Sequence, residues 1–197
     1  FARMVEAGLI GEEDIWRRLR LALDAGNPNV ARAVANALPE TQRPAATLFE
    51  QAARDPGRLL ASGTALDFRR RGDREIALYA LDLLAREHSE QAEQALVKRA
   101  SQFTADELGA AWGRLATWAA RRHEAAALTW FLRARGGNDF QREWWARAAL
   151  RAGDWQAVLR ATDSMREATA AQPVWRYWRA RALQASGQRA AAGPLFL

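Results

Sequence analysis

The sequence predicts an all-α fold, a right-handed superhelical solenoid of tetratricopeptide-like helical hairpins. Nearly every segment of the 197 residues is rich in Ala, Leu, Arg, Glu and Gln, which are strong helix formers. β-branched residues, from which sheets are usually built, are scarce, and the three isoleucines are Ile10, Ile15 and Ile76. A repeated hairpin format and regularly placed turn residues then group the expected helices into pairs.

The repeat is a helical segment that opens with an aromatic residue, continues with Ala and Leu, and turns into a second Ala-rich segment. Its clearest copies run from Trp145 to Gly153 and from Trp178 to Gly187, and their turns are 34 residues apart. This period is typical of tetratricopeptide hairpins, which bury their apolar faces only when stacked. We therefore expect a single α-superhelical domain over residues 1–197, with weaker repeats over 1–103 and clearer repeats over 104–197.

Residues that start and stop helices divide this pattern into elements. Thr104-Ala-Asp-Glu107 is a capping box, and Asn27, Asp73, Ser89, Asn138 and Asp154 are placed to cap helices. Pro28, Pro44 and Pro173 suit first turns, and Gly26, Gly72, Gly153 and Gly187 suit helix ends. Loops are expected at 54–57 and 136–137. Helices are expected over 12–25, 28–37, 43–53, 64–71, 73–86, 89–101, 104–121, 123–134, 139–152, 154–165, 173–185 and 188–196.

The nine tryptophans are unusual for a chain of this length. Trp112, Trp145 and Trp178 each precede an Ala by four residues, which places a bulky side chain and a gap on one helix face. We expect each indole to fill an Ala-lined groove of a neighbouring helix. The aromatic residues expected to form the structural core are Trp16, Trp112, Trp145, Trp175 and Trp178.

The sequence offers no catalytic, cofactor-binding or metal-binding residues. Cysteine is absent, and the only histidines, His88 and His123, have no partner at metal-ligand spacing. Acidic residues such as Glu12 and Asp106 occur at helix starts, where the helix dipole favours them, and none occurs in a clearly apolar segment. No apolar run approaches the length of about 20 residues that a membrane span requires.

Positive charge accumulates in the last third of the chain. Residues 1–132 hold 18 basic and 18 acidic side chains, whereas residues 133–197 hold 11 arginines and 5 acids. Arginines interleaved with tryptophans provide a cationic and stacking surface for a polyanion or a glycan, although a solvated helix face is the simpler interpretation. The candidate contact residues are Arg142, Arg147, Arg151, Arg176, Arg179 and Arg181.

Two hairpins carry a resemblance to a known family. The first is Pro173-Val-Trp-Arg-Tyr-Trp-Arg-Ala-Arg-Ala-Leu-Gln-Ala-Ser-Gly187, and the second is Trp144-Trp145-Ala-Arg-Ala-Ala-Leu-Arg-Ala-Gly-Asp-Trp155. Together they resemble the end of the helical superhelix of the soluble lytic murein transglycosylases. The resemblance covers roughly residues 105–197, and its doubled aromatic residues set it apart from generic tetratricopeptide hairpins.

This resemblance implies a periplasmic bacterial enzyme that cleaves peptidoglycan, in which this region is a non-catalytic scaffold. The family's Glu-Ser pair and its Gly-Leu-Met-Gln run do not occur, so its catalytic Glu has no counterpart. The chain begins at Phe1 and ends at Leu197 in mid-pattern, and we expect it to be a fragment of a longer protein. The implied partners are peptidoglycan glycan strands and the linker and catalytic domain of the parent chain.

Two other functions fit an Arg-rich helical repeat. A stand-alone tetratricopeptide-like adaptor would bind protein partners through a groove with Asn and Lys carboxylate clamps, and the sequence contains no such set. A nucleic-acid-binding repeat would bind oligonucleotides with an affinity that falls steeply with salt. The family resemblance favours the peptidoglycan scaffold over both, and nucleic acid is the less expected partner.

Overall fold

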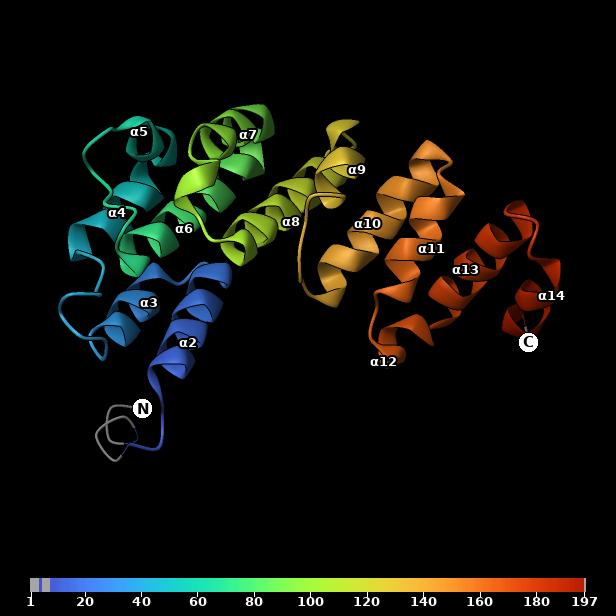
Figure 1. Cartoon of the computed structure of the whole chain (residues 1–197), viewed down its shortest axis with the longest axis horizontal. Coiled ribbons are helices and arrows are strands. Elements are labelled where there is room, and N and C mark those ends of the chain that lie inside the picture. The colour runs from blue at the N-terminus through green and yellow to red at the C-terminus, as the bar shows by residue number, and fades with distance from the viewer. Residues whose placement is uncertain (1–3, 5–7, 197) are drawn as a thin grey trace. The chain divides into compact units, whose positions relative to one another are not determined.

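The computed structural model describes Met4 and residues 8–196, and this part of the chain is helical, without a β-strand. It divides into two compact units, Phe1–Thr104 and Ala105–Leu197, which meet where the repeats in the sequence become clearer. Figure 1 shows the described helices in chain order, with longer loops between α3 and α4 and between α5 and α6. The all-α class is confirmed, whereas the single domain and the right-handed sense of the superhelix stay predictions.

The first unit contains six described α-helices and a 3₁₀ turn, η1 (Ala100–Gln102). Helix α2 packs on α3 and helix α6 packs on α7, while α4 and α5 both lie against α6. The side chains of Trp16, Leu19, Ile76 and Leu96 are completely buried in this unit. The helices are α2 (Glu12–Asp24), α3 (Pro28–Ala35), α4 (Ala46–Arg54), α5 (Pro56–Ala61), α6 (Arg71–Glu87) and α7 (Ser89–Lys98).

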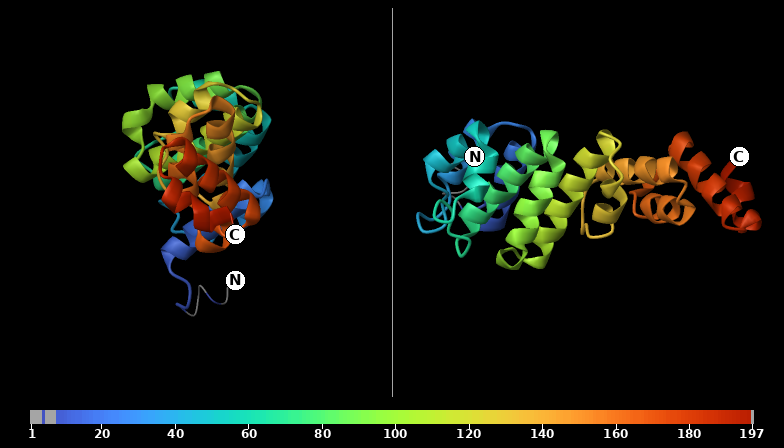
Figure 2. Two further views of the ribbon diagram at one scale, coloured as in Figure 1. Left: turned by 90° about the vertical axis from the view of Figure 1, so that its right-hand side faces the viewer. Right: turned by 90° about the horizontal axis from the view of Figure 1, so that it is seen from above.

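The second unit is a series of hairpins. Helix α8 pairs with α9, α10 with α11, and α13 with α14, and α11 also packs on α13. The right-hand view of Figure 2 shows this succession from yellow to red. Its helices are α8 (Ala105–Arg121), α9 (Ala126–Phe131), α10 (Asp139–Ala152), α11 (Trp155–Asp163), α12 (Glu167–Ala170), α13 (Pro173–Ala185) and α14 (Arg189–Ala192), followed by the 3₁₀ turn η2 (Gly193–Phe196).

The hairpin turns share one backbone arrangement. At Gly153 the backbone has φ +69°, its N–H bonds to the carbonyl of Leu150, and the next N–H bonds to Ala149. Gly26 and Gly187 close their helices in the same way. A left-handed residue just past the helix end satisfies two otherwise unpaired carbonyls, and Gly adopts it without steric cost. The glycines therefore determine where three of the hairpins turn.

His123 occupies the equivalent left-handed position just past the end of α8, although it is not a glycine. Its φ is +64°, its N–H bonds to the carbonyl of Ala120, and the N–H of Glu124 bonds to Ala119. The expected helix start at 123 is therefore wrong, because His123 ends α8 and α9 begins only at Ala126.

Three further expectations in the first unit are wrong. Residues 64–71 do not form a helix; α5 occupies Pro56–Ala61 instead, although 54–57 was expected to be a loop. The Asp55 carboxylate accepts a hydrogen bond from the N–H of Arg58 and Pro56 takes the first turn, so the pair starts a helix. Gly72 lies inside α6, where a Cβ would meet the carbonyl oxygen of Gln42 at 2.3 Å. It is glycine because of close packing, not because a helix ends there.

Alanine allows the helices of the second unit to approach one another. Ala146 and Ala161 are completely buried and pack with Met165 and Trp175, and Trp145 lies partly buried against the same cluster. Trp16, Trp112 and Trp175 are at most 5% exposed, whereas Trp145 and Trp178 are only partly buried. The indoles expected in the core thus differ in how completely the fold removes them from water.

Candidate functional site

Residues 8–196 hold no group of three or more His, Asp and Glu side chains that could bind a metal ion. Within the same range, no helix has both the length and the apolar character that crossing a membrane requires.

Four carboxylates among the described residues are buried, those of Asp73, Glu75, Glu107 and Asp139, although none of them occurs in a clearly apolar segment of the sequence. Glu75, on α6, is 2% exposed. The Nε of Arg20 donates to its Oε2 at 2.8 Å, and a second nitrogen of the same guanidinium donates to its Oε1. This ion pair joins α2 to α6 across 55 residues of sequence. A buried charge without a partner would be strongly unfavourable, and the bidentate Arg satisfies it. Glu75 is therefore a structural residue.

The buried carboxylate of Asp139 organises the second unit. The hydroxyl of Thr169 donates to it at 2.6 Å, the Nε of Arg166 at 2.7 Å and Arg142 at 2.9 Å. The hydrogen bonds from Thr169 and Arg166 hold the pKa of Asp139 well below its usual range. Because Arg166 and Thr169 lie 27 and 30 residues away, this carboxylate ties the start of α10 to α12 and to the residue that precedes it. Arg142, expected to contact a ligand, is part of this network.

A strip of aromatic and cationic side chains follows one face of α10. We call Phe140, Trp144, Arg147 and Arg151 the α10 strip; their spacing of four, three and four residues places them on one side of the helix. Phe140 is 53% exposed and meets Trp144 edge to face, with ring centroids 6.4 Å apart. The strip therefore combines apolar ring surface with two positive charges.

Arg147 is held in place by tryptophans of two helices. Its guanidinium carbon lies 5.1 Å from the ring centroid of Trp144 and 5.0 Å from that of Trp175 on α13. Glu143 accepts hydrogen bonds from it at 3.2 Å. A guanidinium over an indole is attracted by the ring's electron density, so Arg147 is more ordered than a free surface arginine. Its side chain is still 44% exposed, and a ligand can reach it.

Arg151 ends the strip beside a cleft. It is exposed, and within residues 8–196 it forms no ion pair. It lines a cleft of about 200 Å³ together with His123 and Leu128 of the preceding hairpin. Of the predicted arginines on α10, Arg151 therefore carries the least neutralised charge.

The predicted arginines on α13 are distributed differently. Arg179 pairs with Asp163 at 2.6 Å, Arg176 donates to the carbonyl of Leu195 at 3.4 Å, and exposed Arg181 reaches the side chain of Gln184 at 3.4 Å. Beside them Tyr177 is 47% exposed. Arg142, Arg147 and Arg179 all have carboxylate partners. The predicted set is therefore not one uniform cationic stripe.

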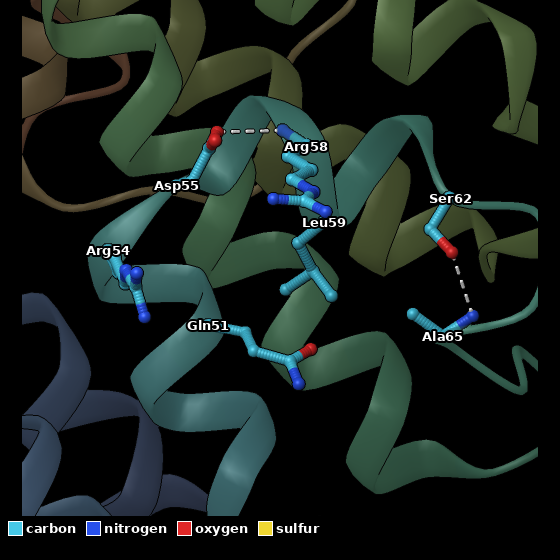
Figure 3. Close-up of a pocket in the computed structure, with 7 residues that line it drawn as sticks. All are labelled: Gln51, Arg54, Asp55, Arg58, Leu59, Ser62 and Ala65. Carbon is cyan, nitrogen blue, oxygen red and sulfur yellow. Dashed lines mark hydrogen bonds between the residues drawn. The ribbon is translucent and has the colours of Figure 1, made fainter.

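The first unit also contains a hollow, of about 550 Å³, drawn in Figure 3. Arg54 and Arg58 lie on its rim with Gln51, while Asp55 and Ser62 use their side chains to cap local backbone N–H groups. Acidic and basic side chains are mixed here, so the hollow favours no particular charge. A second pocket, of about 400 Å³ in the second unit, is lined by three arginines.

Sequence reasoning missed several residues that the fold brings to these surfaces. Phe140 and Trp144 were detectable, because their spacing from Arg147 marks one helix face. Arg135 and Arg160, which line the 400 Å³ pocket, lie 25 residues apart on separate elements, and no periodicity connects them. Only folding brings these two arginines together.

Comparison with known proteins gives matches among solved structures alone. No protein-family model and no curated protein matches the chain. One match is the lytic transglycosylase Slt from Pseudomonas aeruginosa, solved as an inactive mutant, with 29% sequence identity and a TM-score of 0.68. The matched region covers 98% of this chain and 32% of the Slt chain. The 70-kDa soluble lytic transglycosylase Slt70 from Escherichia coli is 22% identical, with a TM-score of 0.61. Here the matched region covers 96% of this chain and 31% of the Slt70 chain.

A third match is the 70-kDa soluble lytic transglycosylase in complex with bulgecin A, with 22% identity and a TM-score of 0.60 over 99% of this chain and 32% of that one. The chain thus spans about a third of the length of the proteins it matches. It is an all-α protein of stacked helical hairpins. The predicted resemblance to the soluble lytic transglycosylases is confirmed, and it extends to the helical, non-catalytic part of those proteins.

Proposed function

We propose that this chain is the non-catalytic helical scaffold of a soluble lytic transglycosylase. The observation that carries the proposal is the match of 98% of the chain to Slt at 29% identity. On this proposal the protein acts in the periplasm. A catalytic domain, joined by a linker in the same parent chain, cleaves the peptidoglycan.

The scaffold positions anionic peptidoglycan strands for that catalytic domain. The α10 strip supports this role, because aromatic faces pack against the apolar faces of sugar rings and guanidiniums attract the anionic groups of the strand. The excess of arginine over acidic residues in 133–197 adds a field that attracts the same ligand. Arg147 and Arg151 are the principal contacts, and Arg176 and Arg181 extend the positive surface onto α13, whereas the predicted contact Arg179 is paired with Asp163.

The proposal is tested by sedimentation with insoluble peptidoglycan sacculi. The 197-residue chain is expected to sediment with sacculi and to be released by salt, since screening weakens attraction between exposed charges. The double variant Arg147→Gln, Arg151→Gln should bind about tenfold more weakly, equivalent to ~1.4 kcal/mol. Phe140→Ala should weaken binding without changing the salt dependence, because it removes ring surface and no charge.

A matched control removes two positive charges elsewhere in the second unit. Arg121 and Arg189 are both exposed and lie outside the α10 strip, so Arg121→Gln, Arg189→Gln should bind sacculi like the unmodified chain. Equal weakening by both double variants would show that net charge alone drives binding. Binding to duplex DNA but not to sacculi would instead support the nucleic-acid alternative.

A further inference from the structure

The 400 Å³ pocket of the second unit lies between α10 and the loop that precedes it; we call it the loop pocket. The end of α9, Gly113 of α8, the 134–137 loop, α10 and α11 all contribute to its lining. All of these elements belong to one compact unit. The pocket is therefore formed by the internal packing of two successive hairpins, α8–α9 and α10–α11, and the loop that joins them.

Glycines permit the loop to approach α8 closely. The N–H of Arg135 donates to the carbonyl of Gly109, and a Cβ at Gly109 would lie 2.4 Å from the Cβ of Arg135. Gly137 has φ +96°, and a Cβ there would lie 2.6 Å from Oε1 of Gln141. Both positions therefore exclude larger residues. This packing holds Arg135 at the pocket.

The polar groups around the loop pocket are mainly hydrogen-bond donors. Arg135 and Arg160 are exposed, and within residues 8–196 neither guanidinium has a hydrogen-bond or ion-pair partner. The Gln141 side-chain oxygen already accepts from the N–H of Asn138, which leaves its amide NH₂ to donate. Among the described residues that line the pocket there is no Asp or Glu.

The remaining polar groups do not change this balance. Arg142 also lines the pocket but directs its guanidinium to Asp139, and the Ser164 hydroxyl donates to the carbonyl of Ala161 at 2.7 Å. The carboxylate of Asp139 is therefore already occupied by its own donors. Arg135 and Arg160 supply the positive charge that the pocket leaves without a partner.

One wall of the pocket is aromatic and contains an unpaired donor. Phe131 and Trp145 are stacked, with centroids 6.0 Å apart and an interplanar angle of 18°. The indole Nε1 of Trp145 is buried without a hydrogen-bond partner. Buried polar groups are almost always satisfied in native proteins, and an orphan of this kind calls for an explanation.

We propose that the loop pocket binds a carboxylate, with Arg135 and Arg160 pairing with its oxygens and the Phe131–Trp145 stack packing against the apolar part of the same ligand. A carboxylate accepts hydrogen bonds and donates none, which matches a pocket rich in donors. The peptides attached to peptidoglycan glycan strands carry carboxylates, and to this extent the inference rests on the proposed function. The loop pocket then recognises the peptide of the strand, while the α10 strip contacts its sugars.

Three soluble probes separate the parts of such a ligand. N-acetylmuramyl-L-alanyl-D-isoglutamine carries both a sugar and a carboxylate, N-acetyl-D-alanyl-D-alanine carries the carboxylate without the sugar, and diacetylchitobiose is a neutral sugar. The ¹⁵N-labelled indole signal of Trp145, assigned with Trp145→Phe, reports on the pocket directly. Both carboxylate probes are expected to shift this signal, and diacetylchitobiose is not.

The double variant Arg135→Gln, Arg160→Gln should bind the carboxylate probes at least tenfold more weakly than the unmodified chain. The control double variant Arg121→Gln, Arg189→Gln should bind them like the unmodified chain. Gly109→Ala should also weaken binding, because it moves the loop without removing a charge. Unchanged affinity in the Arg135, Arg160 variant, a shift of the Trp145 signal with diacetylchitobiose alone, or no shift with either carboxylate probe would overturn the inference.

Sedimentation with sacculi distinguishes this inference from the proposed function. If the chain binds sacculi but neither carboxylate probe reaches the Trp145 signal, the pocket inference fails and the scaffold function stands. If the probes bind in the loop pocket while sacculi do not bind the chain, the carboxylate site stands and its assignment to peptidoglycan is wrong.

Discussion

Trp175 provides the strictest test of how the second unit is stabilised. Its side chain is 2% exposed and packs with Ala146, Ala161 and Met165. Burying a tryptophan removes roughly 200 Å² from water, which at about 25 cal/mol per Å² is worth about 5 kcal/mol. Trp175→Ala also leaves a cavity and removes the ring that Arg147 faces. We therefore expect a loss of about 4–5 kcal/mol.

Trp178 lies on the same helix and serves as the matched comparison. It is only partly buried, and its ring meets that of the exposed Tyr177 at 5.1 Å. Because much less of its surface is removed from water, Trp178→Ala should cost about 2 kcal/mol. The two substitutions delete the same atoms from one helix, so the difference between them isolates the effect of burial.

Urea denaturation followed by circular dichroism gives the free energy of unfolding for each variant. Amide hydrogen exchange locates the loss, which should be greatest in α10, α11 and α13 for Trp175→Ala. A total stability of 5–15 kcal/mol is usual for a domain, so Trp175→Ala is expected to retain little protection in these helices. If both variants lost the same stability, or if exchange rose evenly over the whole chain, Trp175 would not have the central role in packing assigned to it.

Three other substitutions test separate features of the fold by thermal unfolding. Gly72→Ala should destabilise the first unit by about 2 kcal/mol, because the added Cβ meets the backbone carbonyl of Gln42. Gly63→Ala is the control and should cost little, because its Cβ enters open space. Equal effects of the two substitutions would contradict the close contact between Gly72 and Gln42. His123→Gly should stabilise the chain by about 1 kcal/mol, since it relieves a left-handed backbone, and a lower melting temperature would exclude this. Asp139 has a lowered pKa in the folded chain, so its stabilising effect is complete above the unfolded-state value and is lost as pH falls below about 4. Asp139→Asn should therefore be less stable at neutral pH and lose less further stability on acidification; an unchanged acid profile would argue against the network.

Local chemistry explains why α10, α11 and α13 could be predicted closely, whereas the start of α9 was wrong and α12 was not expected. Asn138 and Asp154 cap α10 and α11 with their own side chains, and Gly153 and Gly187 turn the chain after the helices. These signals act within a few residues, so they can be detected in the sequence. Predictions failed where one local pattern has two meanings: Asp55-Pro56 starts a helix where a turn was expected, and Gly72 serves packing where a helix end was expected.

The helical class, the turns at Gly26, Gly153 and Gly187, and the excess of arginine after residue 132 can all be obtained from the sequence, because propensity, capping and composition are local properties. Which charges remain available to a ligand depends on how the helices pack. The tertiary structure pairs Arg179 with Asp163 and Arg142 with Asp139, and it brings Arg135 and Arg160 to one pocket. Such pairings depend on which helices pack together, and helix packing joins residues that no short sequence period relates.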